Sequence, residues 1–193
     1  MARFSPENLE RAKAIVRRYP VARSATIPLL HLAQEQDGHV THDAMEQIGE
    51  LVDATPAEVL GVATFYEMFK EHPVGQYLLG VCTNLSCMLL GAEDIVEHIE
   101  SELGIKVGGT TTDGLFTLEE MQCLAACGGA PCLQVNYRYF EEVTPQRVDG
   151  ILAALRDGQA PEGQEIPPHG TLSRVTLPVP QTPADRERPE ELF

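Results

Sequence analysis

Apolar residues recur at helical spacing through the first 72 positions of the chain. The clearest segment is "TPAEVLGVATFYEMF", whose apolar face is formed by Val59, Val62, Ala63 and Tyr66. Thr55 and Glu58 form a capping box at its start, with Pro56 at the first helical position. Three earlier segments have the same character: residues 5–19, "SATIPLLHLAQEQDG" and "THDAMEQIGELVD". We therefore expect an N-terminal helical bundle over residues 1–72.

After "EHPVGQ" the pattern changes to a mixture of strand and helix. The apolar run "QYLLGVC" is typical of a buried strand and ends at Cys82, while "SCMLLGAEDIVEHIESELG" predicts one amphipathic helix that Gly104 would end. "LFTLEEMQC" has strand character and runs into Cys123, and "CLQVN" and "YRYFEEV" predict a final strand pair with a tight turn. A last helix begins at Thr144. We expect a βαββα unit over residues 73–157: strand, helix, strand, strand, helix.

Residues 158–193 differ from the rest because they hold seven of the chain's 14 prolines. Proline at this density excludes long helices and inner strands. Two interpretations stay open here: a disordered tail, or an extended arm that lies along a partner through the apolar residues of "TLSRVTLPVP". The expected fold class is therefore α+β, with a helical bundle, a βαββα domain and an extended proline-rich tail.

The charge balance narrows the choice of partners. Acidic residues outnumber basic ones 29 to 14, which gives a net charge of −15. Such a chain is poorly suited to a nucleic-acid backbone or an anionic membrane surface as its main partner. No apolar run approaches the roughly 20 residues that span a bilayer, and the N-terminal segment has no apolar signal core. We expect no nucleic-acid partner, no direct membrane insertion and a cytoplasmic location.

The cysteines are the candidate chemistry. They are spaced Cys82-x4-Cys87, then 35 residues, then Cys123-x3-Cys127, with Cys132 following. Each pair lies in a loop just after a predicted strand. If the two strands lie side by side, their ends bring two loops of two thiols to one edge of the sheet. Four convergent thiolates bind a thiophilic metal centre.

Three interpretations of these thiols compete. Free cysteine is often simply buried, but that does not explain four thiols in loops. Structural zinc takes four thiolates, usually from tighter two-residue knuckles. A 2Fe–2S cluster is also held by four cysteines, two for each iron, and tolerates looser spacing. The spacing alone places iron–sulfur only slightly ahead of zinc.

The neighbouring residues favour iron–sulfur. Five small residues surround the second pair: Ala125, Ala126, Gly128, Gly129 and Ala130. Backbone can therefore approach a bulky inorganic centre, and its N–H groups can point at sulfur. "TNLS" can act in the same way at the start of a helix.

Other candidate sites are weaker. His39 and His42 lie in a helix-linking loop, where capping or plain exposure explains them. "VGGTTTDG" lacks the G-x-G-x-x-G fingerprint and predicts a turn. We find no feature built to bind NADH or a flavin.

Taken in this order and spacing, "GVATFYEMF", "VCTNLSCMLLG" and "CLAACGGAPCLQVN" resemble the 24-kDa-type (E subunit) 2Fe–2S proteins of respiratory complex I, the NADH–quinone oxidoreductase. The resemblance covers roughly the first 157 positions. It implies a thioredoxin-like ferredoxin domain behind a helical bundle that docks to other subunits. It also implies the ligands of one 2Fe–2S cluster, namely Cys82, Cys87, Cys123 and Cys127. Cys132 is outside this ligand set, and we interpret it as a small core residue.

The resemblance implies an electron-transfer subunit of an oxidoreductase. The cluster would exchange single electrons with the FMN of a flavoprotein subunit that also binds NADH, and a neighbouring iron–sulfur subunit would be a second partner. The chain would lie in the peripheral arm, on the cytoplasmic side of the membrane, and would not oxidise NADH by itself. Two alternatives remain: the equivalent subunit of an NAD-linked hydrogenase or formate dehydrogenase, and a structural zinc module.

Overall fold

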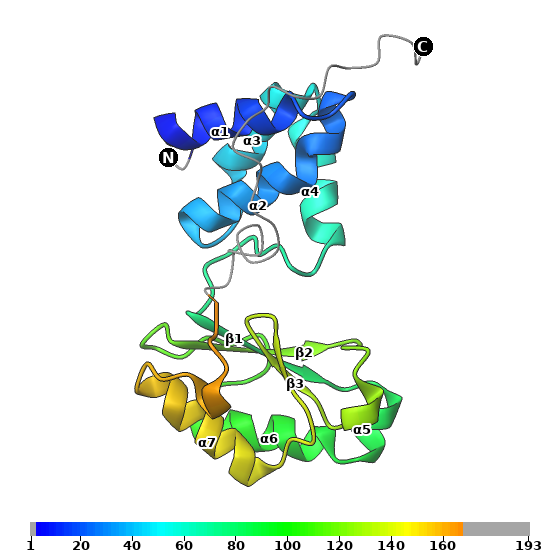
Figure 1. The fold of residues 1–193 in the computed structure, drawn as a ribbon, viewed down its shortest axis with the longest axis vertical. Helices are drawn as coiled ribbons and strands as arrows, with labels where there is room; N and C mark the ends of the chain where they lie inside the picture. Colours follow the sequence, from blue (N-terminus) through cyan, green and yellow to red (C-terminus); the bar gives the residue numbers. More distant parts are fainter. Residues whose placement is uncertain (1–2, 168–193) are drawn as a thin grey trace. The chain divides into compact units, whose positions relative to one another are not determined.

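A computed structural model describes residues 3–167 of the chain (Figure 1). The described residues form two compact units, one up to Pro73 and one from Val74 onward. Each unit has its own apolar core. No helix in the described part of the chain is long and apolar enough to cross a membrane.

The first unit consists of helices. They are α1 (Pro6–Val16), the short 3-10 helix η1 (Ala22–Ala25), α2 (Thr26–Asp37), α3 (His42–Val52) and α4 (Pro56–Phe65). Their buried faces share one core, which includes Leu29, Leu30, Ile48, Val52 and Val59. The capping box at the start of α4 is confirmed, because the Thr55 hydroxyl accepts from the Glu58 N–H and the Glu58 carboxylate accepts from the Thr55 N–H.

Two of these helices are shorter than the sequence predicts. α1 ends at Val16 and is followed by a turn, so it stops before Tyr19. α4 ends at Phe65, because the next residue, Tyr66, adopts an extended backbone. The ends of helices depend on tertiary contacts that periodicity does not report.

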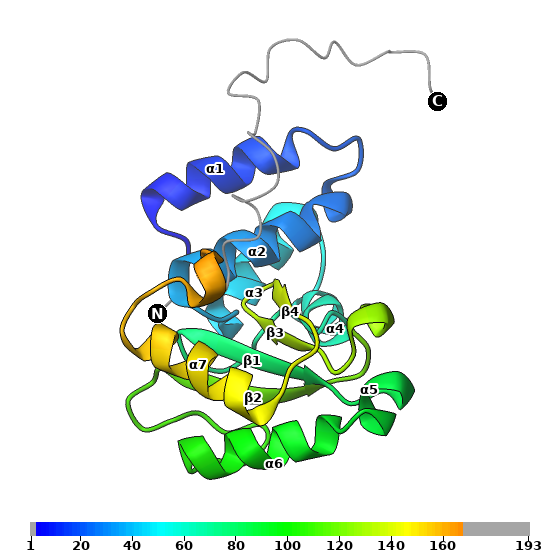
Figure 2. The same cartoon turned by 60° about the horizontal axis from the view of Figure 1, so that its bottom comes forward.

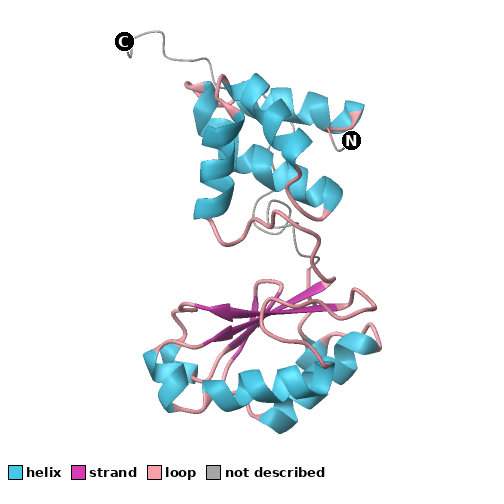
Figure 3. Cartoon of the chain, turned by 180° about the vertical axis from the view of Figure 1, so that it is seen from behind, coloured by secondary structure: helices cyan, strands magenta, loops and turns pink. Residues whose placement is uncertain are grey.

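The second unit is built on a four-stranded mixed sheet with the order β2-β1-β3-β4. The strands are β1 (Tyr77–Cys82), β2 (Phe116–Met121), β3 (Leu133–Val135) and β4 (Arg138–Phe140). β1 pairs with β2 in parallel, as convergence of the two cysteine loops requires, whereas β1–β3 and β3–β4 are antiparallel. Helices α6 (Ala92–Leu103) and α7 (Pro145–Arg156) lie on one face of the sheet (Figures 1 and 3).

All four strands predicted from the sequence form, so the expected βαββα order counts one strand too few, and it also counts one helix too few. Both strands of the final pair form in addition to β1 and β2, so the sheet has four strands. The segment predicted as one helix is divided into α5 (Leu85–Leu89) and α6, since Gly91 between them has a left-handed φ of 93°. The division leaves Leu89 and Leu90 exposed at the end of α5.

Part of the segment assigned to the tail packs on the second unit. A short 3-10 helix, η3 (Pro161–Gly163), lies in this segment, and Ile166 packs against the core of the sheet. The Glu162 carboxylate pairs with the Arg147 guanidinium of α7 at 2.6 Å. The remainder of the predicted tail, residues 168–193, lies outside the described residues.

The tight turn predicted between the last two strands is confirmed, and Asn136 stabilises it. Asn136 and Tyr137 both have positive φ, at 41° and 72°, as a two-residue hairpin turn requires. The Asn136 side chain is buried. It accepts from the Leu78 N–H at 2.8 Å and donates to the Gln76 carbonyl at 2.8 Å and the Pro167 carbonyl at 3.0 Å. One amide thus joins the start of β1, the hairpin and the C-terminal end of the described chain.

We expect Asn136→Ala to destabilise the second unit. It would leave the buried Leu78 N–H and the part-buried Gln76 carbonyl without their partner. Because one unsatisfied buried group costs about 1–3 kcal/mol, the free energy of unfolding should fall by about 1–3 kcal/mol. Urea denaturation followed by circular dichroism measures this change. Gln159→Ala, at an exposed amide, is the matched control and should stay within about 0.5 kcal/mol of wild type. Equal stability of the two variants would contradict this role for Asn136.

Candidate metal centre

The parallel pairing of β1 and β2 brings the two cysteine loops together. Cys82 is the last residue of β1 and lies opposite Met121, the last residue of β2. The Thr83 N–H donates to the Met121 carbonyl at 3.2 Å, so the two chain segments stay in contact as they leave the sheet. Figure 2 shows α5, which carries Cys87, beside this edge. The two chain segments that carry the predicted residues are therefore neighbours, but the expectation of two pairs in loops is wrong in part. Cys82 ends β1, Cys87 lies in α5 and Cys127 begins the 3-10 helix η2 (Cys127–Gly129), so only Cys123 lies in a loop.

Asn84 links these two loops directly. Its Oδ1 accepts from the Leu85 N–H at 2.8 Å and thereby caps α5. Its Nδ2 donates to the carbonyl of Gln122 at 2.7 Å, one residue before Cys123. The pattern "TNLS" indicates N–H donors and does not by itself predict this bridge. The sequence feature that could have indicated this bridge is Asn84 itself, an N-cap residue directly in front of a short helix.

The four thiols differ in exposure. Cys82 and Cys87 are buried, at 3% and 2% exposure, whereas Cys123 and Cys127 are exposed. The thiols of Cys87 and Cys123 both act on the pKa of Cys82, so thiols from the two segments are neighbours. The donor set therefore extends from the core of the second unit to its surface.

Backbone N–H groups point at the cysteine sulfurs, as the small residues of the sequence suggested. Ala125, at a positive φ of 57°, donates its N–H to the Cys123 Sγ at 3.3 Å. Burial opposes ionisation of Cys82, but N–H groups of Asn84 and Leu124, together with the neighbouring thiols, outweigh it and lower the pKa of Cys82 overall. The thiolate, which is the form that binds metal, is thereby favoured at this position.

Cys87 and Cys132 behave differently from Cys82. Burial first, and then the Cys82 thiol, raise the pKa of Cys87. Burial first, and then the charge of the Cys87 sulfur, raise the pKa of Cys132 to about 12. Cys132 therefore keeps its proton at neutral pH. Its S–H donates to the carbonyls of Ala126 at 3.1 Å and Gly129 at 3.2 Å, on either side of Cys127.

Cys132 is thus a core residue with a further role that the sequence did not reveal. It is 1% exposed and packs in the apolar core, as expected from the sequence. Its thiol also fastens the loop that carries Cys127, as a neutral donor to two carbonyls. A protonated thiol engaged in this way is unlike a metal-binding thiolate.

Gly129 has a steric role in the same loop. A Cβ built on Gly129 would stand 2.5 Å from the Cβ of Glu141, which is closer than real atoms approach. A Cβ on the adjacent Gly128 would meet nothing within 4 Å. The Glu142 N–H donates to the Gly129 carbonyl at 2.6 Å, so this close approach is part of the loop's fixed structure.

The spread of the sulfur atoms disfavours a single zinc ion. Tetrahedral zinc, with Zn–S bonds of about 2.3 Å, holds all four sulfurs about 3.8 Å apart. Among residues 3–167, no three cysteines bring their sulfur atoms within 4.8 Å of one another. A 2Fe–2S cluster needs only two sulfurs close together at each iron. The donor chemistry and the N–H groups directed at sulfur fit this group.

Comparisons with known proteins give the same family as the motifs. The family model of thioredoxin-like 2Fe–2S ferredoxins matches residues 12–156. The E subunit of the NADH-quinone oxidoreductase of Mycobacterium tuberculosis is 36% identical over 195 residues, covering 97% of this chain and 75% of that protein. NADH-quinone oxidoreductase subunit 2 of Thermus thermophilus is 43% identical over 146 residues, covering 75% of this chain and 81% of that protein.

A solved structure shows the same fold. In the crystal structure of an NAD+-reducing NiFe hydrogenase in its air-oxidised state, one chain matches 72% of this chain with a TM-score of 0.62 and 18% identity. The matched part is 24% of that hydrogenase chain, so this protein spans about a quarter of its length. At this identity the likeness concerns the fold alone.

We expect four of the five cysteines to be essential for a cluster. Changing any one of Cys82, Cys87, Cys123 or Cys127 to serine should abolish or strongly distort the visible spectrum and lower bound iron and acid-labile sulfide. Cys132→Ser should keep the full iron content, because its sulfur serves as a hydrogen-bond donor and serine retains a donor. Loss of iron in the Cys132 variant with an unaffected Cys127 variant would overturn the assignment.

Gly129→Ala should disturb the Cys127 loop, whereas Gly128→Ala should not. Because the added methyl group at position 129 runs into Glu141, the loop must shift, and overpacking of this kind costs about 1–3 kcal/mol. We expect less bound iron per chain and a lower melting temperature for Gly129→Ala. The Gly128 variant adds the same methyl group one residue away into open space. The same iron content and melting temperature in both variants would show that the loop tolerates the shift.

Proposed function

Because the chain belongs to the thioredoxin-like 2Fe–2S ferredoxin family, we propose that it is the electron-transfer subunit of an NADH–quinone oxidoreductase. The observation that carries this proposal is the meeting of two cysteine loops at the ends of the parallel strands β1 and β2. The relatives that cover most of the chain are subunits of this kind.

Four side chains would hold one 2Fe–2S cluster: Cys82, Cys87, Cys123 and Cys127. Such a cluster, when bound, supplies one-electron exchange. The chain contributes N–H donors to the sulfurs and a buried inner pair of ligands that keeps water from one side of the site. The exposed pair, Cys123 and Cys127, lies on the side of the site from which a redox partner can approach.

Partner contact at this edge is supported by an apolar patch on α5. Leu85, Leu89 and Leu90 are 62%, 73% and 61% exposed, and Met88 is exposed as well. Exposed apolar residues gathered in one place mark interaction surfaces. The patch lies on the helix that carries Cys87. It would contact the flavoprotein subunit that holds FMN and binds NADH, and a neighbouring iron–sulfur subunit would dock at another surface of the chain.

The same observations bear on the two alternative functions, a structural zinc module and a subunit of a hydrogenase or formate dehydrogenase. The zinc module is disfavoured by the family match and by the spread of the sulfur atoms. The likeness to the hydrogenase chain concerns fold only, so an assembly of the hydrogenase type has no support beyond that. We further propose that the helices of residues 1–72 dock to other subunits, and that the chain lies in the cytoplasmic peripheral arm of the complex.

The electrostatics of the second unit oppose the addition of an electron. Residues 75–157 contain 12 acidic and 4 basic residues, a net charge of 4 − 12 = −8. Solvent screening limits the effect to charges within about 10 Å. We therefore expect a low reduction potential for the bound cluster.

The pure, cluster-loaded chain should be bleached by dithionite but not oxidise NADH. A hydride carries two electrons and one 2Fe–2S cluster accepts one, so a flavin must divide the pair. The experiment mixes the chain with NADH and ferricyanide, first alone and then with the flavoprotein subunit, and follows NADH absorbance. Oxidation should begin only with the flavoprotein subunit. Brisk oxidation by the chain alone would show a nucleotide site within it and overturn this division of roles. A chain that binds zinc in place of iron and sulfide would overturn the proposed function itself.

A further inference from the structure

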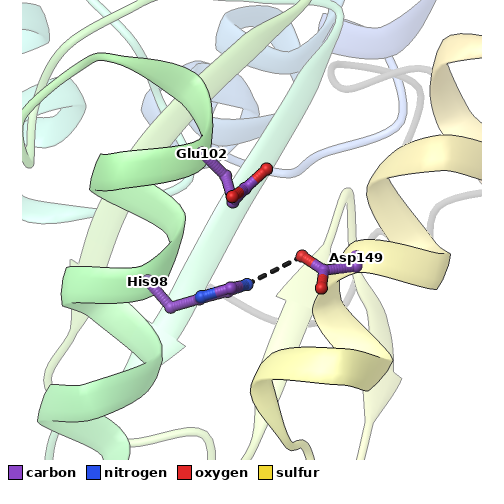
Figure 4. A group of neighbouring side chains, drawn as sticks. All are labelled: His98, Glu102 and Asp149. Carbon is purple, nitrogen blue, oxygen red and sulfur yellow. Dashed lines mark hydrogen bonds and ion pairs between the residues drawn. The ribbon is translucent and has the colours of Figure 1, made fainter.

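Helices α6 and α7 bring together three side chains with metal-binding atoms, outside the cysteine loops. His98 and Glu102 lie one turn apart on α6, and Asp149 lies on α7 (Figure 4). One ligating atom from each residue lies within 4.8 Å of the other two. The His98 Nε2 is 2.7 Å from the Asp149 Oδ1. Among residues 3–167, this is the single group of three or more such side chains at this spacing.

The charges within this group are unbalanced. Glu102 has no hydrogen bond or ion pair within the described residues, although one of its carboxylate oxygens lies within 4.8 Å of a carboxylate oxygen of Asp149. Lys106, which lies beyond the end of α6, is paired with Glu100 at 2.6 Å instead. Two carboxylates at close range repel each other unless a cation lies between them or a proton is added. A divalent cation would offset both charges at once.

The three residues lie at the solvent-exposed rim of two packed helices, with Glu102 and Asp149 exposed and His98 partly buried. On α6, Ile95 and Ile99 are buried in the core, which leaves His98 partly exposed at its edge. On α7, Val148 and Ile151 are buried on either side of Asp149, which is exposed. The ligands therefore project from two packed helices rather than from loops, which is the arrangement that gives a metal site defined geometry.

We propose that His98, Glu102 and Asp149 form a binding site for a divalent transition-metal ion of the zinc type. Imidazole suits zinc and its neighbours, whereas magnesium and calcium prefer oxygen ligands alone. In a tetrahedral zinc site with bonds of about 2.0–2.2 Å, the imidazole nitrogen and a carboxylate oxygen lie about 3.3 Å apart. The contact between His98 and Asp149 would open slightly to admit the ion, which the half-exposed Asp149 carboxylate can do by rotating. Water would take the remaining position.

Such an ion would join α6 to α7 and stabilise the second unit, because it binds only the folded arrangement. The site is independent of the proposed electron transfer, since it uses none of the five cysteines. A bound metal at this position would thus be additional to the iron of a cluster.

The test measures zinc binding by the full-length, cluster-loaded chain. Equilibrium dialysis against Zn2+ in the presence of excess Mg2+, followed by elemental analysis, should find one zinc per chain with the iron content and the visible spectrum unchanged. Zinc should also raise the melting temperature of the wild-type chain. No zinc uptake, or uptake matched by loss of iron, would overturn the proposal, because the second result would place the metal on the cysteines.

Three variants locate the site. Glu102→Gln is the key variant, because Glu102 has no partner among the described side chains and its loss should not disturb folding. It and His98→Gln should weaken zinc binding by more than the roughly 10- to 100-fold that loss of an outer-sphere partner costs. His42→Gln is the matched control: His42 and Glu46 are four residues apart on α3 at 3.5 Å, without a third ligand in the described chain. Unchanged binding in Glu102→Gln, or equal loss in His42→Gln, would refute the site.

Discussion

The parallel register of β1 against β2 is the constraint on which the candidate metal centre depends. The pairing runs from Tyr77 opposite Phe116 to Cys82 opposite Met121, so both strands end at the same edge. All six residues of β1 and the first three of β2 are buried, so a slip of one residue in β2 would displace side chains that the core already holds. Packing of the sheet therefore fixes where the two cysteine loops begin. The position of the candidate metal centre thus follows from the strand register, which packing of the apolar core fixes.

Once the loops begin at the right place, neutral hydrogen bonds determine their shape. Asn84 joins the first loop to the second through the Gln122 carbonyl, and Cys132 holds two carbonyls on either side of Cys127. Both residues act on backbone rather than on sulfur charge. A loop fixed in this way loses little conformational freedom when it binds a metal centre, which favours binding. The second loop thus combines exposed thiols, Cys123 and Cys127, with a fixed backbone.

Local signals in the sequence predicted the elements well, because their causes are local. The capping box of Thr55 and Glu58 is made within four residues, and the tight turn at Asn136 within two. The parallel strands followed from the placement of the cysteines and from apolar runs. The break at Gly91 was missed because apolar residues continue through it at helical spacing, while a glycine reveals its φ only in the fold. The group of His98 and Asp149 could not be predicted, since 51 positions separate two residues that only helix packing brings together.

The fold also explains how thiolates can be stabilised in so acidic a domain. Its basic side chains are engaged elsewhere. Lys106 pairs with Glu100, Arg147 pairs with Glu162, Arg138 donates to the Glu165 carbonyl, and the Arg156 guanidinium lies 5.8 Å from the centre of the Phe116 ring. The cysteine sulfurs are instead met by N–H groups of Asn84, Leu124 and Ala125. The N–H dipoles lower the free energy of a negative charge on sulfur, but they leave the net charge of the domain unchanged. The site therefore favours the thiolate at Cys82 yet resists each further electron, and the surrounding negative field favours a partner surface that is positive at its rim.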